Sequence, residues 1–177
     1  AESQLRDSLD ILPQTLPVDW LISAFLSLAR AAVQSEPDGG DSQEILDNGE
    51  RLGLINRIPR LVRAIRYEKI RLALTRGNCR EARNLFRVLT EFPFEGLPQG
   101  WTHFAEGCDD DFICQTRLDI FCNNPLSVLE PLQTEISAAR KTGHIRREIK
   151  LLILQSLAHS TLGNKAPCQN AMLEAVR

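Results

Sequence analysis

One turn pattern occurs twice in this chain: an apolar, helix-like segment stops at Gly-Asn, and an amphipathic segment follows at once. The first copy stops at Gly77-Asn78 and the second at Gly163-Asn164. Glycine readily adopts the left-handed conformation that ends many helices, and asparagine is preferred at helix starts. Each helix pair must bury its apolar side against a neighbouring pair. The pattern predicts an all-α fold, a right-handed superhelix of antiparallel helix pairs like tetratricopeptide repeats.

Apolar residues recur at steps of three and four through most of the chain, which is the spacing of one helical face. We expect helices over residues 20–34 (with Asp19 as its cap), 42–52, 59–76, 79–89, 112–122, 126–142, 145–162 and from 165 onward. Residues 1–17 form an entry arm and residues 92–107 an irregular loop, within a single helical-repeat domain over 1–177. The second helices of the pairs begin near residues 79, 125 and 166, so the expected repeat is roughly forty residues long.

The bulk properties exclude several classes of protein. With 177 residues and 43% apolar residues, the chain can bury a core without disulfides. A net charge of −2 gives no general attraction for nucleic acid or anionic membranes. No apolar run is long enough to span a membrane. The chain lacks a starting methionine and stops inside an expected helix at Val176-Arg177, so we expect a fragment of a larger protein.

The cysteines give little support for chemistry. Their number, five, is odd and they show no tight pairing, which favours free thiols and a cytoplasmic location. Cys108, Cys114 and Cys122, with His103 nearby, are spaced more widely than paired zinc ligands. We therefore expect no metal, and interpret Cys114 and Cys122 as small apolar residues of a helix.

Catalysis and cofactor binding are also not expected. Cys79 and Cys168 lie near helix starts, where a thiol becomes more acidic, but no residue pattern marks a base beside them. The chain has no phosphate-binding loop and no dinucleotide-binding glycine pattern. Three acids, Asp109–Asp111, with Glu106 before them, lack the ligand spacing of a calcium loop and suit the positive end of a helix.

A run of basic residues is the main candidate for binding. Its members step by about three residues along the expected helix 59–76 and just before it: Arg57, Arg60, Arg63, Arg66, Lys69, Arg71 and Arg76. The favoured interpretation is a solvated face with ion pairs between helices. Contacts to nucleic-acid phosphates are one alternative, and an anionic or sugar-like ligand is another. Candidate ligand- or partner-binding residues are Arg63, Arg66, Tyr67 and Arg71.

Three stretches carry a resemblance to a known family: RAIRYEKIRLALTRGNCREARNLFRVL (63–89), PLSVLEPLQTEISAARKTGHIRREIKLLILQSLAHSTLGN (125–164) and APCQNAMLEAVR (166–177). Together they resemble the helical-repeat domain of large ATP-dependent LuxR-type transcription activators of the MalT-like group. The resemblance implies a sensor domain between an ATP-binding module and a DNA-binding module, both absent from this chain. It implies an inducer small molecule or a regulatory protein as partner, and self-association.

We therefore expect a non-catalytic, cytoplasmic sensor or protein-interaction domain of a transcription regulator. Two other classes stay open. One is a free-standing protein–protein adaptor that docks a peptide or helix. The other is a hydrolase using Cys79 or Cys168. Direct DNA binding by these residues is a weaker fourth hypothesis.

Overall fold

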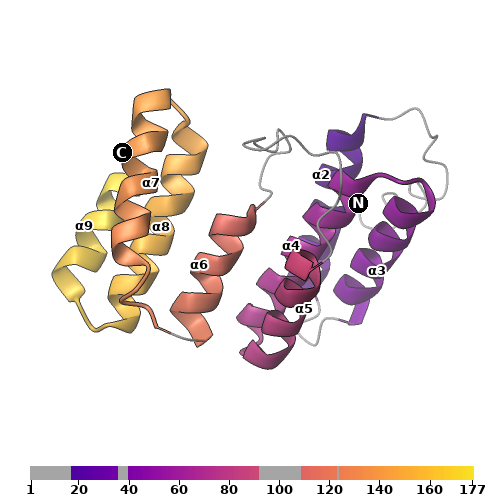
Figure 1. Ribbon diagram of the computed structural model, residues 1–177, viewed down its shortest axis with the longest axis horizontal. Coiled ribbons are helices and arrows are strands. Elements are labelled where there is room, and N and C mark those ends of the chain that lie inside the picture. Colours follow the sequence, from indigo (N-terminus) through magenta and orange to yellow (C-terminus); the bar gives the residue numbers. More distant parts are fainter. Residues whose placement is uncertain (1–16, 36–39, 92–108, 123) are drawn as a thin grey trace. The chain divides into compact units, whose positions relative to one another are not determined.

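The computed structural model describes residues 17–35, 40–91, 109–122 and 124–177, and all regular secondary structure in these ranges is α-helix (Figure 1). The helices are α2 (Val18–Ser35), α3 (Gly40–Ile55), α4 (Pro59–Thr75), α5 (Cys79–Glu91), α6 (Asp111–Cys122), α7 (Leu129–Thr142), α8 (Ile145–Thr161) and α9 (Lys165–Val176). The all-α class is thus confirmed for the described ranges. The entry arm, apart from residue 17, and the loop 92–107 lie outside them.

A glycine turn links α4 to α5, α7 to α8 and α8 to α9, and the sequence pattern predicts the turns at Gly77 and Gly163. Gly77, Gly143 and Gly163 all have positive φ, between 71° and 75°, and a helix begins two residues after each. The His144 amide donates to the Ala139 carbonyl at 3.0 Å, and the Asn164 amide to the His159 carbonyl at 2.9 Å. These bonds span five residues and close a left-handed helix stop. The turn pattern therefore ends helices for the expected reason.

Several helix starts differ from the prediction: α3 begins at Gly40 and not at residue 42, and α6 begins one residue early, at Asp111. Asp19 is not the cap of α2 but lies in its first turn, because the helix begins at Val18. Helix α7 begins at Leu129, three residues later than expected. The cause is a side-chain turn: Asn124 Oδ1 accepts the Leu126 amide at 3.1 Å, and the Asn124 carbonyl accepts the Ser127 hydroxyl at 2.8 Å. Such local bonds compete with helix formation.

The chain divides into two compact units, and the first comprises residues 1–73 and 81–110. Helices α2, α3 and α4 share one apolar core, in which Ile22, Leu46 and Ile65 are fully buried. Helix α4 is buried around most of its circumference. A side chain at Gly49 of α3 would come within 3.0 Å of Phe25 and Ile65, so glycine permits this close packing.

The second unit comprises residues 74–80 and 111–177. Helix α8 packs between α7 and α9 and also contacts α6. Leu132, Ile136 and Leu151 lie at the centre of its core. Ion pairing of Arg147 with Glu135, and of Arg140 with Glu148, fixes α7 and α8 as an antiparallel pair. None of the helices in the described ranges combines the length and apolarity needed to cross a membrane. A single repeat domain over 1–177 stays a prediction.

Candidate functional site

The predicted binding residues Arg63, Arg66, Tyr67 and Arg71 all lie on α4, but the fold uses each of them internally. Arg71 donates to Glu68 Oε1 at 2.9 Å. Arg30 of α2 donates to both oxygens of the same carboxylate, at 3.0 and 2.8 Å. Glu68 is only 3% exposed, so two guanidinium groups neutralise a charge inside unit 1.

A second carboxylate, Glu50 of α3, holds the next basic residues of α4. Arg66 donates to Glu50 Oε1 at 2.7 Å, and Lys69 pairs with Glu50 Oε2. Lys69 also pairs with Asp47 at 2.7 Å. The predicted ion pairs between helices are therefore confirmed. The predicted solvation of this face is wrong in part, since Lys69 and Glu68 are buried between helices.

Burial and the neighbouring cations shift the pKa of a carboxylate in opposite directions, and for both Glu50 and Glu68 the cations together have the larger effect. Burial by itself raises the pKa of Glu50, but hydrogen bonds from Lys69 and Arg66 outweigh it and leave that pKa below its ordinary value. Burial likewise raises the pKa of Glu68, and the hydrogen bonds from Arg30 and Arg71 again lower it overall. Both groups stay ionised as structural partners of the α4 cations.

Tyr67 is the least accessible of the predicted ligand residues. Its side chain is 1% exposed, and its hydroxyl accepts a hydrogen bond from Arg63 Nε at 2.6 Å. The Arg63 guanidinium also lies 5.7 Å from the centre of the Tyr67 ring. These two residues contact each other, and the Tyr67 side chain is buried. Ligand binding by α4 stays a prediction, and its geometry favours a structural role.

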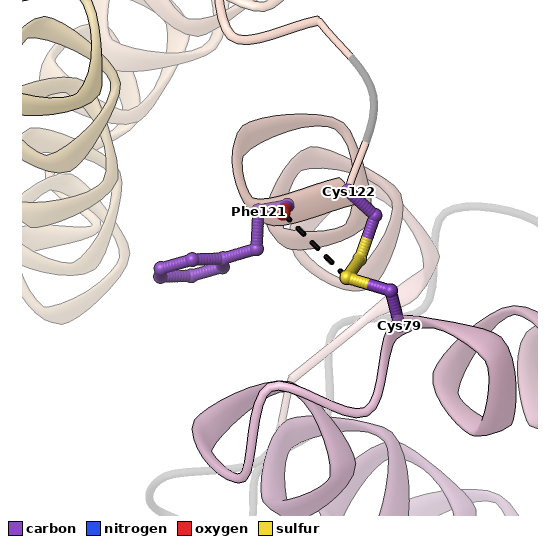
Figure 2. The surroundings of a disulfide bond; sticks show 3 residues. All are labelled: Cys79, Phe121 and Cys122. Atoms are coloured by element: carbon purple, nitrogen blue, oxygen red, sulfur yellow. Dashed lines mark hydrogen bonds between the residues drawn. A yellow bond between two sulfur atoms is a disulfide. The ribbon is translucent and has the colours of Figure 1, made fainter.

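Two cysteines expected to be free thiols are joined in a disulfide. Cys79, at the start of α5, is bonded to Cys122, at the end of α6, with their Cα atoms 5.6 Å apart (Figure 2). The Cys79 sulfur also lies 3.5 Å from the Phe121 carbonyl oxygen. A disulfide sulfur carries no proton, so this is a contact in the oxidised form. The expectation of free thiols, and the argument from it for a reducing cytoplasm, is wrong for this pair.

The disulfide also removes a candidate nucleophile. Cys79 in this form has no thiolate to attack a substrate. The other candidate, Cys168 of α9, has its sulfur 3.3 Å from Ser156 Oγ of α8. The Ser156 hydroxyl donates to the Cys168 carbonyl at 3.0 Å, which leaves its oxygen to accept from the thiol. These contacts link α8 and α9.

Within the described ranges, no three His, Cys, Asp or Glu side chains lie close enough to hold a metal ion. Cys122 is bonded to Cys79, and His103, Glu106 and Cys108 lie outside those ranges. Asp111 is in the first turn of α6, as the helix-end interpretation of the acidic run predicts.

The remaining feature is an exposed set of apolar side chains on α8 and α9. Ile149 and Ile153 of α8 are 38% and 39% exposed, although α8 also buries Leu151 and Leu154 in the core. On α9, Met172 is 44% and Val176 77% exposed. We call these four residues the α8–α9 apolar face. Isoleucines at every fourth residue of 145–153 were the sequence signal for it, since they give α8 a second apolar side.

The α8–α9 apolar face points away from α7. Arg140 of α7 bonds to Glu148 of α8 at 2.5 Å and to Glu174 of α9 at 2.7 Å. Both carboxylates therefore mark the side of the hairpin that α7 covers. Successive residues rotate by about 100° around a helix. Met172 and Val176, each two residues from Glu174, thus lie on the opposite side of α9.

The same rotation applies to α8. Ile149 and Ile153 follow Glu148 by one and five residues, so they are turned about 100° and 140° from it. Because α8 and α9 are antiparallel and joined at Ser156 and Cys168, Ile153 lies at the level of Ala171 and Ile149 at the level of Ala175. The four apolar residues consequently form two adjacent rows along one side of the hairpin.

Comparisons with known proteins add no assignment: no protein-family model, no curated protein and no solved structure matches this chain. The resemblance to MalT-like regulators therefore rests on the quoted sequence stretches alone.

Proposed function

We propose that this chain is a non-catalytic protein-interaction domain and that the α8–α9 apolar face is its docking surface. The observation that carries the proposal is the exposure of Ile149, Ile153, Met172 and Val176 together on one side of a helix pair. Single exposed apolar residues are common on any surface, whereas a grouped set is typical of an interaction site. Within unit 2, the disulfide between Cys79 and Cys122 supports a rigid carrier for that face.

The larger setting proposed for this domain is a LuxR-type, MalT-like transcription regulator. Stacking of α7, α8 and α9 through glycine turns supports the superhelical arrangement that such a domain requires. A partner that binds one state of the regulator better than another shifts it toward that state. The size of the shift depends on that preference and not on tightness alone. A free-standing adaptor is the alternative, and it uses the same face.

Site-specific photo-crosslinking in the producing cell tests the docking proposal. A photoreactive phenylalanine analogue replaces Ile149 on the apolar face in one variant and Ala138, on the exposed side of α7, in a control. The proposal predicts a discrete crosslinked protein from position 149 and none from position 138. The same adducts from both positions, or no adduct from 149, would refute docking at this face.

A further inference from the structure

The Cys79–Cys122 disulfide lies at the surface of unit 2, where a dissolved thiol can reach it. Both cysteines are partly exposed, and the residues next to them, Arg80 and Phe121, are exposed. The bond joins the first residue of α5 to the last residue of α6 (Figure 2). Thiol–disulfide exchange requires such access, because the attacking thiolate must approach one of the two sulfur atoms. Cys114, on the same helix as Cys122, is by contrast buried.

The two sulfur atoms belong to opposite ends of their helices. Cys79 begins α5, and Cys122 ends α6. The amino end of a helix carries a partial positive charge and its carboxyl end a partial negative one. A thiolate at a helix amino end is therefore stabilised, and it leaves more readily when a disulfide is broken. Cys79 is the better leaving group of the pair for this reason.

Charged side chains act in the same direction. Arg80, which is exposed, directly follows Cys79 and favours a negative sulfur there. Asp119 lies three residues before Cys122, on the same side of α6, and disfavours a negative sulfur at Cys122. Gln115 donates a hydrogen bond to Asp119 at 3.0 Å, which leaves the charge of the carboxylate in place. Other charged residues near Cys79 have interactions of their own and are not needed for this effect: Arg76, Glu81 and Arg83.

The Phe121 carbonyl distinguishes the two sulfur atoms as targets. Its oxygen lies 3.5 Å from the Cys79 sulfur, in the last turn of α6, where carbonyl groups have no partner within the helix. The partial negative charge of this oxygen opposes a thiolate that approaches Cys79. Once Cys79 is released and protonated, its S–H group can donate to the same oxygen. The contact therefore favours attack on Cys122 and stabilises the released Cys79 thiol.

We propose that the Cys79–Cys122 disulfide is a redox-sensitive link that a small thiol opens by attack on Cys122. The attacking thiolate forms a new S–S bond with Cys122, and the electron pair of the broken bond leaves on Cys79, which takes a proton from water. A second thiolate then attacks the sulfur of the bound thiol and releases Cys122. The two small thiols are oxidised to their own disulfide, and the protein disulfide is reduced to two thiols. This chemistry is independent of docking at the α8–α9 apolar face.

Trapping the first product tests the proposal on the oxidised full chain. N-ethylmaleimide first blocks the free thiols that it can reach. A small uncharged thiol, 2-mercaptoethanol, is then added without denaturant, deuterated N-ethylmaleimide stops the exchange early, and peptide mapping locates each group. The mercaptoethanol adduct on Cys122, with the deuterated label on Cys79, should exceed the reverse arrangement about ten-fold or more. Equal amounts, an excess of the reverse arrangement, or no opening in the folded chain would overturn the proposal.

Charge variants test the role of Cys79 as the leaving group. Arg80→Glu should slow opening of the disulfide about three-fold or more, because it replaces a stabilising charge with a repelling one. The matched control, Arg177→Glu after the end of α9, makes the same change of charge and should open at the parent rate. Salt at about 0.5 M should reduce the effect of Arg80→Glu, since it screens exposed charges. Circular dichroism confirms that each variant is folded. Equal rates in Arg80→Glu and the control would contradict the assignment of Cys79 as the leaving group.

Discussion

Arg30 of α2 donates two hydrogen bonds to Glu68 of α4, 38 residues further along the chain. The Glu68 carboxylate is buried, whereas the Arg30 guanidinium is partly exposed. A bidentate bond of this kind fixes the relative position of two helices as well as neutralising a charge. It also explains why basic residues on α4 do not form an open binding face: their partners lie inside the same unit.

The first prediction concerns Glu68. Replacing it with Ala leaves Arg30 and Arg71 without their shared acceptor and opens a cavity beside α4. Removal of one partner of a buried ion pair typically costs about 3–5 kcal/mol; exposure of Arg30 to water favours the lower end of that range. Urea unfolding at neutral pH measures the change. The control Glu44→Ala, an exposed position on α3, should stay within about 0.5 kcal/mol of the parent protein.

A second prediction concerns acid. Unfolded Glu side chains titrate near pH 4.3, at about their ordinary pKa. The folded pKa values of Glu50 and Glu68 are lower, so the unfolded state binds more protons as the pH falls. Their stabilising contribution is present above about pH 4.3 and is lost as the pH falls through the lowered values. Urea midpoints from pH 7 to 3 should show this loss, and Glu68→Gln should show a smaller one.

Tyr67 gives a third prediction, which revises its expected role as a surface ligand residue. Because the ring is buried, Tyr67→Ala should destabilise unit 1 by about 3–5 kcal/mol. Tyr67→Phe keeps the ring and removes the hydroxyl that accepts the bond from Arg63, and the loss of a hydrogen bond costs about 1 kcal/mol. Thermal unfolding compares the two variants. Equal and small effects would show that Tyr67 is not a core residue.

A fourth prediction compares substitutions at two glycines, Gly77 and Gly49. The first should destabilise the fold through backbone strain and the second through steric contact. Gly77 has φ 73° and open space around an added Cβ, so Gly77→Val should cost about 1–2 kcal/mol through backbone strain alone. Gly49→Ala should also destabilise, but through contact with Phe25 and Ile65. Shortening Ile65 to Val should partly rescue Gly49→Ala and leave Gly77→Val unaffected. Rescue of both, or of neither, would contradict this distinction.

The disulfide gives a fifth prediction. Peptide mapping without reductant should recover Cys79 linked to Cys122, while Cys114 and Cys168 react with a thiol reagent after unfolding. The bond closes a loop with a sequence separation of 43 residues, so the chain-entropy model predicts a stabilisation of up to about 4 kcal/mol. Cys79→Ser with Cys122→Ser should remove that stabilisation and make unfolding insensitive to dithiothreitol. Other cysteine pairings in the map would refute the assignment.

Periodicity and turn residues predict the helices well, because both act locally. Gly77, Gly143 and Gly163 end helices through their own backbone preference, whatever surrounds them. Long-range pairing is different. Arg71 is a local partner of Glu68, but its other partner, Arg30, lies on α2, and the partner of Cys79 lies on α6; no local pattern identifies these two distant partners. The sequence does not show which carboxylates pair with the basic residues of α4, so these residues were interpreted as a solvated face.

The α8–α9 apolar face could in part have been predicted. Ile145, Ile149 and Ile153 repeat at every fourth residue beside the buried leucines of the same helix. The pattern shows that α8 has two apolar sides, but not which of them a neighbouring helix covers. That depends on Arg140, which draws Glu148 and Glu174 toward α7.

Met172 is the only methionine of the chain, so its oxidation reports directly on the α8–α9 apolar face. Dilute peroxide followed by intact-mass measurement gives the rate of sulfoxide formation in the folded protein. Because Met172 is exposed, its oxidation in the folded protein should be fast, at a rate close to that of the unfolded chain. Slow oxidation in the isolated folded protein would show that the face is already covered, and would contradict the central claim.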